Sequence, residues 1–398
     1  MRLAQKSHTI GTAIDERRDP QARRRLARLL WFTTCASVIT VSLSPDLTAE
    51  RKSAARIGLD LVYQVTMPAN WKGQLKALLD TDSKYLYIAA SSEGKLRLRI
   101  LNWGTDKVVR EADYSQWNCG SDNISVWDWV QGRPYIHLRY CRSEYLLDAT
   151  SLAVVRRIGD VHRSGEGAVF SATGDVVLVS TFDVAEGKLK RALHRVADWS
   201  KIGNWDHPGV GPAFTLDGRY IVVEDVRSGP WKGPTSTVNR VLECGLSVYE
   251  VATGNRLAHW MTSPDEGQCL GGSLVFVPHT RYHIIDQAPG HSFSVRELFT
   301  GEVLFDLPSE LRPSTAPSIS PDGQLVVAGA WDDPEDSTWS RDFIIWDLRT
   351  REVVYQTPRY RSVWGRNTTG REVFPQFSFD GKYVIVAKEK AVEIWLIR

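Results

Sequence analysis

Residues 317–356 read PSISPDGQLVVAGAWDDPEDSTWSRDFIIWDLRTREVVYQ, and this stretch decides the fold. Its short apolar and alternating segments are typical of β-strands, which we expect at residues 317–319, 324–328, 342–347 and 352–356. A Ser-Pro-Asp-Gly turn at 320–323, a long polar loop and a second turn at 348–351 separate these segments. The stretch therefore predicts one antiparallel sheet of four short strands.

The same pattern recurs along residues 57–398 with a period of about 40–50 residues, which is typical of propeller blades. The other copies begin near residues 74, 124, 168, 212, 273 and 375. These repeats predict an all-β, seven-bladed β-propeller over residues 57–398. Six or eight blades remain alternatives, because the copies that begin at residues 124 and 168 are weak.

The last copy contains only three strand-like segments, and residues 59–65 (LDLVYQV) match the fourth-strand segment EVVYQT of residues 352–357. We therefore expect residues 57–68 to complete the last blade. Closing the ring in this way removes the open sheet edges that favour aggregation.

The turn at 320–323 has a clear physical basis. Pro321 presets the backbone angle φ of its position, Asp322 caps the turn, and Gly323 can adopt a positive φ. Large rings lie at the ends of the expected third strands, at Tyr249, Trp346 and Trp395, where they suit packing between neighbouring sheets. Most of the 15 Trp residues are therefore expected in the core.

The turn at 320–323 and the Trp346-Asp347 pair resemble the WD-repeat family. Partial copies at 214–218 and 377–381, with Thr-Gly turns at 253–254 and 300–301, extend this resemblance over residues 57–398. The Gly-His pair typical of the family is absent from every copy, and only the sixth copy carries the Trp-Asp pair. The resemblance implies a seven-bladed binding platform, usually without catalysis.

The charge of the chain is uneven. The formal net charge is +2, but residues 1–28 hold eight Lys/Arg and three Asp/Glu, which leaves 41 basic and 44 acidic residues in the remainder. The body is thus mildly acidic, so a nucleic-acid partner is not expected.

The N-terminus combines a basic tail at residues 1–25 with an apolar run that reads LARLLWFTTCASVITVSL from residue 26. This pattern predicts a hydrophobic helix at 26–44 that acts as a signal anchor or signal peptide, followed by a linker at 45–56. The tail would remain cytoplasmic, and the propeller would be membrane-anchored outside the cytoplasm, periplasmic or extracellular. The alternative is a cytoplasmic protein, since the run is short for a spanning helix.

The long connections between the second and third strands are expected on one face of the propeller. They span residues 226–241 in the fourth blade and 331–341 in the sixth. Because function is often carried by variable loops on a rigid scaffold, we expect partners to bind this long-loop face. The predicted binding residues are Trp231, Lys232, Trp331, Asp332, Asp333, Glu335 and Trp339. The alternative is that these loops are only tolerated insertions.

Five cysteines are present, one of them in the apolar run. The other four can pair in three ways. The expected topology places all four on the long-loop face and favours the disulfides Cys119–Cys141 and Cys244–Cys269. Both would require an oxidising compartment, and four reduced thiols are the alternative.

No residue pattern predicts catalysis, a cofactor or a resident metal. The acidic run at 332–336 offers oxygen ligands for Ca²⁺ but lacks the spacing of a calcium-binding loop, which favours a solvated acidic loop. The main hypothesis is a non-catalytic, membrane-tethered scaffold that binds protein or peptide partners. The alternative is a propeller enzyme of the lactonase-like hydrolase type, with a metal in the central channel.

Overall fold

The computed structural model describes residues 57–398 except 69–70, 72–73, 93–94, 118–123, 161–166, 184, 187, 206, 208, 233–236, 263–273, 281–282, 288–292, 309–311, 314, 332–338, 359, 362–372 and 389. These residues belong to the unit Arg51–Arg398, and they form strands and turns without a helix. No helix capable of spanning a membrane therefore occurs in this part of the chain. The predicted tail, apolar helix and linker lie outside the described residues.

The strands form seven antiparallel sheets, numbered here in chain order. Sheet 1 contains β2 (Gln74–Leu79), β3 (Tyr85–Ser92), β4 (Lys95–Asn102) and β5 (Lys107–Tyr114). Sheet 2 contains β6 (Ile124–Val130), β7 (Tyr135–Tyr140), β8 (Ser143–Asp148) and β9 (Val154–Asp160). Sheet 3 contains β10 (Ala168–Phe170), β11 (Val176–Asp183), β12 (Lys188–Arg195) and β13 (Lys201–Asn204).

Two more sheets also have four strands. Sheet 4 contains β14 (Val210–Phe214), β15 (Tyr220–Lys232), β16 (Thr237–Glu250) and β17 (Arg256–Thr262). Sheet 5 contains β18 (Val275–Phe276), β19 (His283–Gln287), β20 (Phe293–Glu297) and β21 (Val303–Asp306).

Sheet 6 has six strands, and sheet 7 joins the two ends of the described chain. Sheet 6 contains β22 (Arg312–Pro313), β23 (Ser318–Ile319), β24 (Leu325–Trp331), β25 (Trp339–Asp347), β26 (Glu352–Gln356) and β27 (Tyr360–Arg361). Sheet 7 contains β28 (Phe374–Phe377), β29 (Tyr383–Ala387), β30 (Ala391–Ile397) and β1 (Leu59–Thr66).

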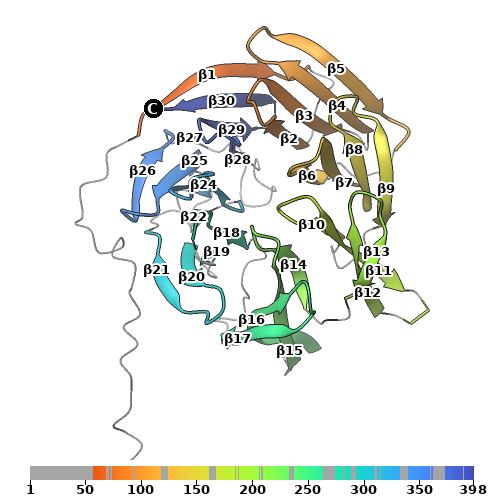
Figure 1. Ribbon diagram of the computed structural model, residues 1–398. Coiled ribbons are helices and arrows are strands. Elements are labelled where there is room, and N and C mark those ends of the chain that lie inside the picture. The colour runs from red at the N-terminus through yellow and green to blue at the C-terminus, as the bar shows by residue number, and fades with distance from the viewer. Residues whose placement is uncertain are drawn as a thin grey trace, which may run out of the picture. The chain divides into compact units, whose positions relative to one another are not determined.

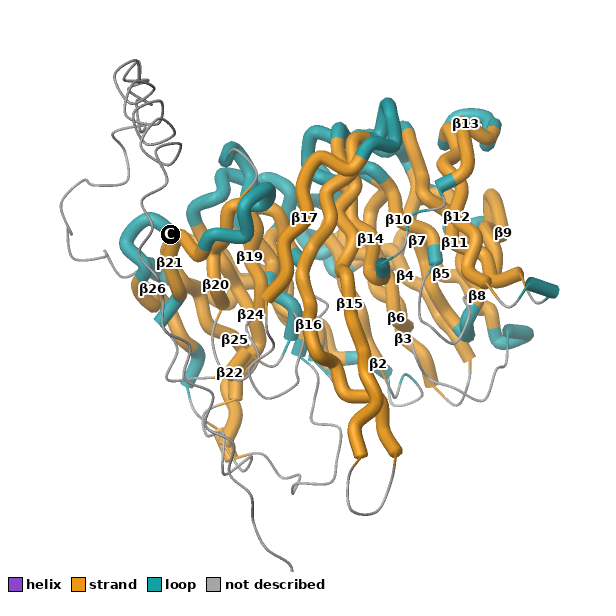
Figure 2. Tube along the Cα trace, turned by 90° about the horizontal axis from the view of Figure 1, so that it is seen from below, coloured by secondary structure: helices purple, strands orange, loops and turns teal. Residues whose placement is uncertain are grey.

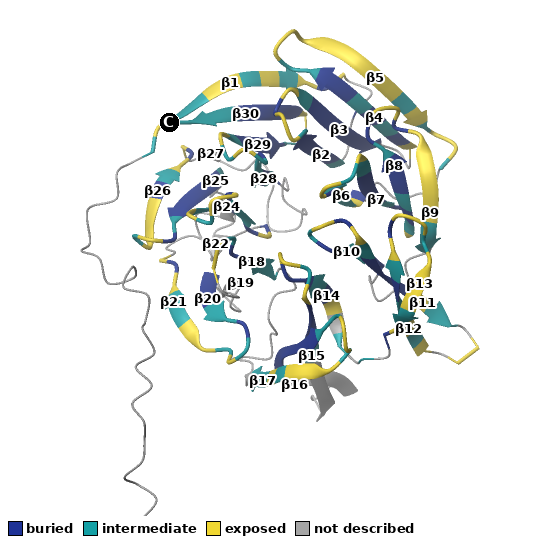
Figure 3. Cartoon of the chain, viewed as in Figure 1, coloured by how far each residue is buried: buried dark blue, intermediate teal, exposed yellow. Residues whose placement is uncertain are grey.

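The sheets are arranged around a central axis like the blades of a propeller (Figure 1). The predicted all-β propeller is therefore confirmed. Six sheets are regular four-stranded blades, and sheet 6 carries two short additional strands. Outer strands such as β5 are largely exposed, whereas the second and third strands of most sheets are buried (Figure 3).

β1 pairs antiparallel with β30, from Leu59 opposite Ile397 to Thr66 opposite Ala391. This is the ring closure that the sequence predicts. The pairing covers the edge of β30 and links the first described strand to the last, with one register shift between Leu61 and Tyr63.

The core consists of a separate apolar cluster between each pair of neighbouring sheets. The predicted aromatic contacts are confirmed, with ring-centroid distances of 5.7 Å for Tyr249–Trp205, 5.7 Å for Trp346–Phe293 and 5.8 Å for Trp395–Phe343. The cluster between sheets 2 and 3 is the smallest and contains only Ala168, Val177, Val179 and Val196 as fully buried members among the described residues.

The turn after the first strand uses the same hydrogen bonds in several sheets. In sheet 6, Ser320 Oγ accepts from the Leu325 N–H at 2.8 Å, and Asp322 Oδ1 accepts from the Gln324 N–H at 3.0 Å. Equivalent bonds form around Ser378 and Asp380 and around Thr215 and Asp217. Gly323 has a φ of 71°, which confirms the predicted positive φ.

The predicted loop at 226–241 is wrong, because β15 and β16 continue as a paired hairpin as far as Lys232 opposite Thr237. The Gly-Pro sequence at 229–230 suggests a loop, but beyond Asp225 the only described strand that pairs with β15 is β16, so the other edge of β15 is open among the described strands. A proline can occupy such an edge because no ladder partner needs its missing N–H. The predicted loop at 331–341 is also shorter, since Trp331 ends β24 and Trp339 begins β25.

Candidate functional site

The two extended connections lie on the same face of the propeller. Figure 2 shows the β15–β16 hairpin projecting beyond the neighbouring strands, on the side where β22 of sheet 6 also extends. We call this side the long-loop face, and the side that carries the turns after the first strands the short-turn face. In each sheet, the connection between the second and third strands lies on the long-loop face. The turn between the first and second strands lies on the opposite, short-turn face.

The predicted binding residues occupy two separate places on this face. Trp231 and Lys232 belong to the last residue pairs of the β15–β16 ladder, where they lie opposite Val238 and Thr237. Trp331 pairs with Ser340 and with Arg312 of β22, while Trp339 pairs with Arg361 of β27. The structure thus brings Trp331 and Trp339 onto adjacent strands, and it leaves Trp231 and Lys232 on sheet 4, with sheet 5 between them. Asp332, Asp333 and Glu335 lie outside the described residues.

The predicted disulfides each have one cysteine outside the described residues, Cys119 in one pair and Cys269 in the other. Cys141 follows β7, at the end of sheet 2 that belongs to the long-loop face. Cys244 is buried in β16. Both pairings remain predictions.

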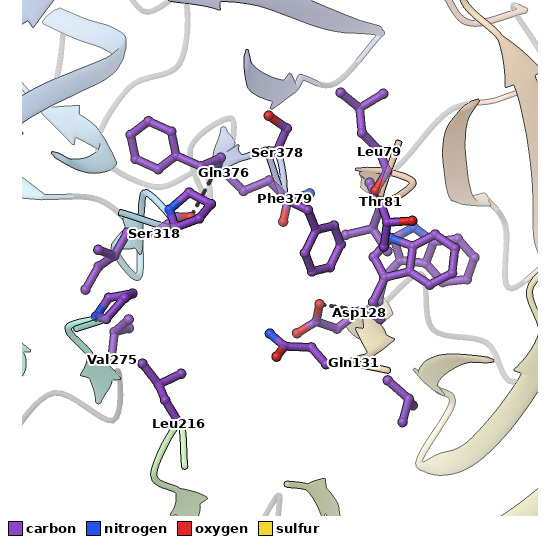
Figure 4. Close-up of a pocket in the computed structure, with 18 of the residues that line it drawn as sticks. Leu79, Thr81, Asp128, Gln131, Leu216, Val275, Ser318, Gln376, Ser378 and Phe379 are labelled. Atoms are coloured by element: carbon purple, nitrogen blue, oxygen red, sulfur yellow. Dashed lines mark hydrogen bonds between the residues drawn. The ribbon is translucent and has the colours of Figure 1, made fainter. Parts of the chain in front are cut away.

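A second candidate site, which the sequence does not predict, is a central cavity with a volume of about 1400 Å³. It is lined by innermost strands of the propeller and by the turns that follow them, so it reaches the short-turn face. The wall includes β6 and the turn at Gln131, the turn at Thr215, the segment around Val275, Ser318 of sheet 6, and β28 with Phe379 (Figure 4). The cavity exceeds the roughly 300–1,000 Å³ of a typical small-molecule pocket.

Several charged groups line this cavity, and most of them have protein partners. Arg133 forms a salt bridge with Asp175 of the next sheet. Asp217 accepts from Thr215 Oγ1 at 2.6 Å and from the Arg219 N–H at 3.0 Å. Asp80 accepts from the N–H groups of Lys84 and Tyr85 at 2.6 and 2.8 Å, although burial raises the pKa of its carboxyl.

Asp128 of β6 differs from these groups. Its side chain points into the cavity (Figure 4) and is exposed, and its carboxylate accepts a hydrogen bond from the Trp129 N–H at 2.8 Å. Desolvation in the cavity raises the pKa of the Asp128 carboxyl, while the Trp129 N–H and the charge of His137 act in the opposite direction.

A buried charged cluster lies behind Asp128, on the face of sheet 2 that is directed toward sheet 3. Glu144 of β8 has an exposed fraction of 2% and accepts from Arg139 Nε at 2.7 Å and from the Ala168 N–H of β10. His137 Nε2 lies 3.4 Å from Glu144 Oε1. Burial raises the pKa of Glu144, but the interactions with His137, Arg139 and the Ala168 N–H outweigh it and lower the pKa.

The backbone register explains how Asp128 reaches this cluster. Asp128 is directly opposite His137, and Arg139 is directly opposite Glu144, so the four side chains share one face of sheet 2. The sequence contains one signal of this arrangement, a carboxylate between two tryptophans in Trp127-Asp128-Trp129. Sequence reasoning missed it because the spacing along the chain does not show which residues face the central axis.

Comparison with known proteins adds no family assignment, since no family model matches the chain and no curated protein matches its sequence. The fold and the geometry of the two candidate sites therefore provide the functional argument.

Proposed function

We propose that this chain is a WD-repeat-like propeller of seven blades, with sheet 6 counted as a blade, that acts as a non-catalytic interaction scaffold. It binds protein or peptide partners through the long-loop face. Residues 26–44 tether it to a membrane with the propeller outside the cytoplasm, where the disulfides Cys119–Cys141 and Cys244–Cys269 can form.

The observation that carries this proposal is the projecting β15–β16 hairpin. Among the described strands, β15 beyond Glu224 and β16 before Cys244 pair only with each other, so the outer edges of the hairpin are open in this part of the chain. An exposed strand edge can accept an additional strand from a peptide. Trp231 lies in this unsupported part, and tryptophan is enriched where proteins bind one another.

The enzyme alternative has less support. Within the described residues, no group of three or more His, Cys, Asp or Glu side chains is placed to hold a metal ion. The cavity carboxylates Asp80 and Asp217 accept hydrogen bonds from backbone N–H groups of their own turns.

The proposal can be tested by photo-crosslinking in cells with the full chain. A photoreactive phenylalanine analogue replaces Trp231 in one variant, Trp339 in a second and Ile202 of β13 in a control, because Ile202 has an exposed fraction of 51% on an outer strand. We expect discrete ultraviolet-dependent adducts at 231 or 339 that are absent at 202. Identical adducts at all three positions, or none at 231 and 339, would contradict a binding role of this face.

A further inference from the structure

Asp128 is a charged group of the central cavity that forms no salt bridge among the described residues, although the charge of His137, directly opposite it on β7, acts on it. Arg133 is paired with Asp175, Asp80 and Asp217 are bonded within their turns, and the Lys76 ammonium lies 2.9 Å from the centroid of the Phe374 ring. A cation bound in the cavity would give the Asp128 carboxylate a salt-bridge partner in addition to the Trp129 N–H.

The surroundings of Asp128 fit a planar cation. Gln131, in the turn that follows β6, lines the same cavity as Asp128, and its side chain also points into the cavity (Figure 4). Its amide oxygen can accept a hydrogen bond, so the two side chains together offer three oxygen acceptors on one side of the cavity. A guanidinium carries five N–H donors in a rigid fork, which matches several acceptors better than the point charge of an ammonium.

Aromatic rings also line the cavity, and their contacts with neighbouring groups hold them in place. Trp129 Nε1 donates to the Leu79 carbonyl at 2.9 Å, and the Trp129 ring packs edge-on against Tyr87 with a centroid distance of 4.9 Å. Phe379 lies at the same wall, with its centroid 6.5 Å from that of Trp129. An aromatic ring that lines a cavity can attract an organic cation to its face.

We propose that the central cavity, which the rings of Trp129 and Phe379 also line, binds a guanidinium group that donates hydrogen bonds to the oxygens of Asp128 and Gln131. The group can belong to a small molecule or to an arginine side chain, because the shared chemistry is the planar cation. The cavity volume of about 1400 Å³ leaves room for the rest of such a ligand. This site is independent of the proposed long-loop face, since it reaches the opposite side of the propeller.

Calorimetric titration of the full chain tests the proposal, with Nα-acetyl-arginine methylamide as the cationic probe. The matched neutral probe is the citrulline analogue, which has nearly the same shape and no charge. We expect the arginine probe to bind at least about tenfold more tightly than the citrulline probe, as one charge-assisted hydrogen-bonded contact contributes roughly that ratio. Equal binding of both probes, or no binding of the arginine probe at millimolar concentration, would overturn the proposal.

Variants assign the effect to Asp128. Asp128→Asn should weaken the arginine probe about tenfold and abolish the preference over citrulline, while Asp217→Asn, which changes a turn carboxylate on the same cavity, should remain within about twofold of the wild type. Gln131→Ala, on an exposed turn, provides a second variant if Asp128→Asn does not fold, and should weaken the probe less. A chain with the β15–β16 hairpin shortened should bind the probe normally, which separates this site from the proposed partner-binding face.

Discussion

Sheet 2 and sheet 6 have the same antiparallel strand order but use their side chains differently. Sheet 6 contains the repeated turn with Ser320 and Asp322, and Trp346 packs against sheet 5 with an exposed fraction of 1%. Sheet 2 has no such turn. It directs Asp128 into the cavity and buries Glu144 against sheet 3.

The difference suggests that loss of the repeat pattern has a physical cause. The cluster between sheets 2 and 3 contains few buried apolar residues, and the charges of Glu144, His137 and Arg139 occupy part of the same interface. Buried charges contribute less to stability than apolar packing of the same volume. A sheet that keeps buried charges beside a cavity, at the expense of stability, is a candidate for a functional role and not only a structural one.

The largest effect is expected for Glu144→Ala in sheet 2. The substitution removes a buried carboxylate that accepts from Arg139 and from the Ala168 N–H and lies beside His137, so we expect a loss of about 3–5 kcal/mol in the free energy of unfolding. Urea unfolding at pH 7 measures it. A loss below about 1 kcal/mol, as for an exposed ion pair, would show that the cluster does not stabilise the fold.

The pH dependence of the same residue provides a control. Because the folded-state pKa of Glu144 is lower than its ordinary value of 4.5, the ionised carboxylate stabilises the fold above that value and the contribution disappears as the pH falls through the folded-state pKa. The difference between the wild type and Glu144→Gln should therefore decrease when unfolding is measured at progressively lower pH below 4.5. A constant difference would contradict this origin.

A smaller effect is expected for Gly323→Ala in the repeated turn of sheet 6. At a φ of 71°, alanine is strained, and its Cβ would lie 2.5 Å from the Pro278 carbonyl oxygen of the neighbouring sheet. We expect a loss of about 1–3 kcal/mol. Gly218→Ala is the matched control, because Gly218 has a φ of 67° in the equivalent turn and its Cβ would meet nothing closer than 3.8 Å. Equal losses in thermal unfolding would exclude a contribution from the Pro278 contact.

The sequence predicts those features of the fold that depend on local chemistry. The Ser-Pro-Asp-Gly turn, the strand alternation and the closing segment at 59–65 can be read directly, because turns and strand periodicity depend on neighbouring residues. Sheet 2 lacks the turn, yet its alternating residues still predict its strands. The predicted loop at 226–241 is wrong because Pro230 is compatible with a strand at an open sheet edge, and the sequence does not show which edges are open.

The cavity site could not be predicted from the sequence. Asp128 and Gln131 are close along the chain, but Phe379 comes from the other end of the propeller and reaches Trp129 only through ring closure. Which strand residues face the axis depends on the packing of all the sheets. The carboxylate between two tryptophans in Trp127-Asp128-Trp129 is visible in the sequence, but only the structure shows that it lines the cavity.

The most direct measurement is an NMR titration of Asp128 in the full chain, labelled with carbon-13 at the aspartate carboxyl groups and assigned with Asp128→Asn. Without ligand, we predict a pKa above the ordinary aspartate value of 3.8, because burial disfavours the carboxylate. Saturation with Nα-acetyl-arginine methylamide should lower this pKa, since a bound guanidinium stabilises the charged form, and the citrulline analogue should leave it unchanged. An Asp128 pKa that is unaffected by the arginine probe would contradict the account.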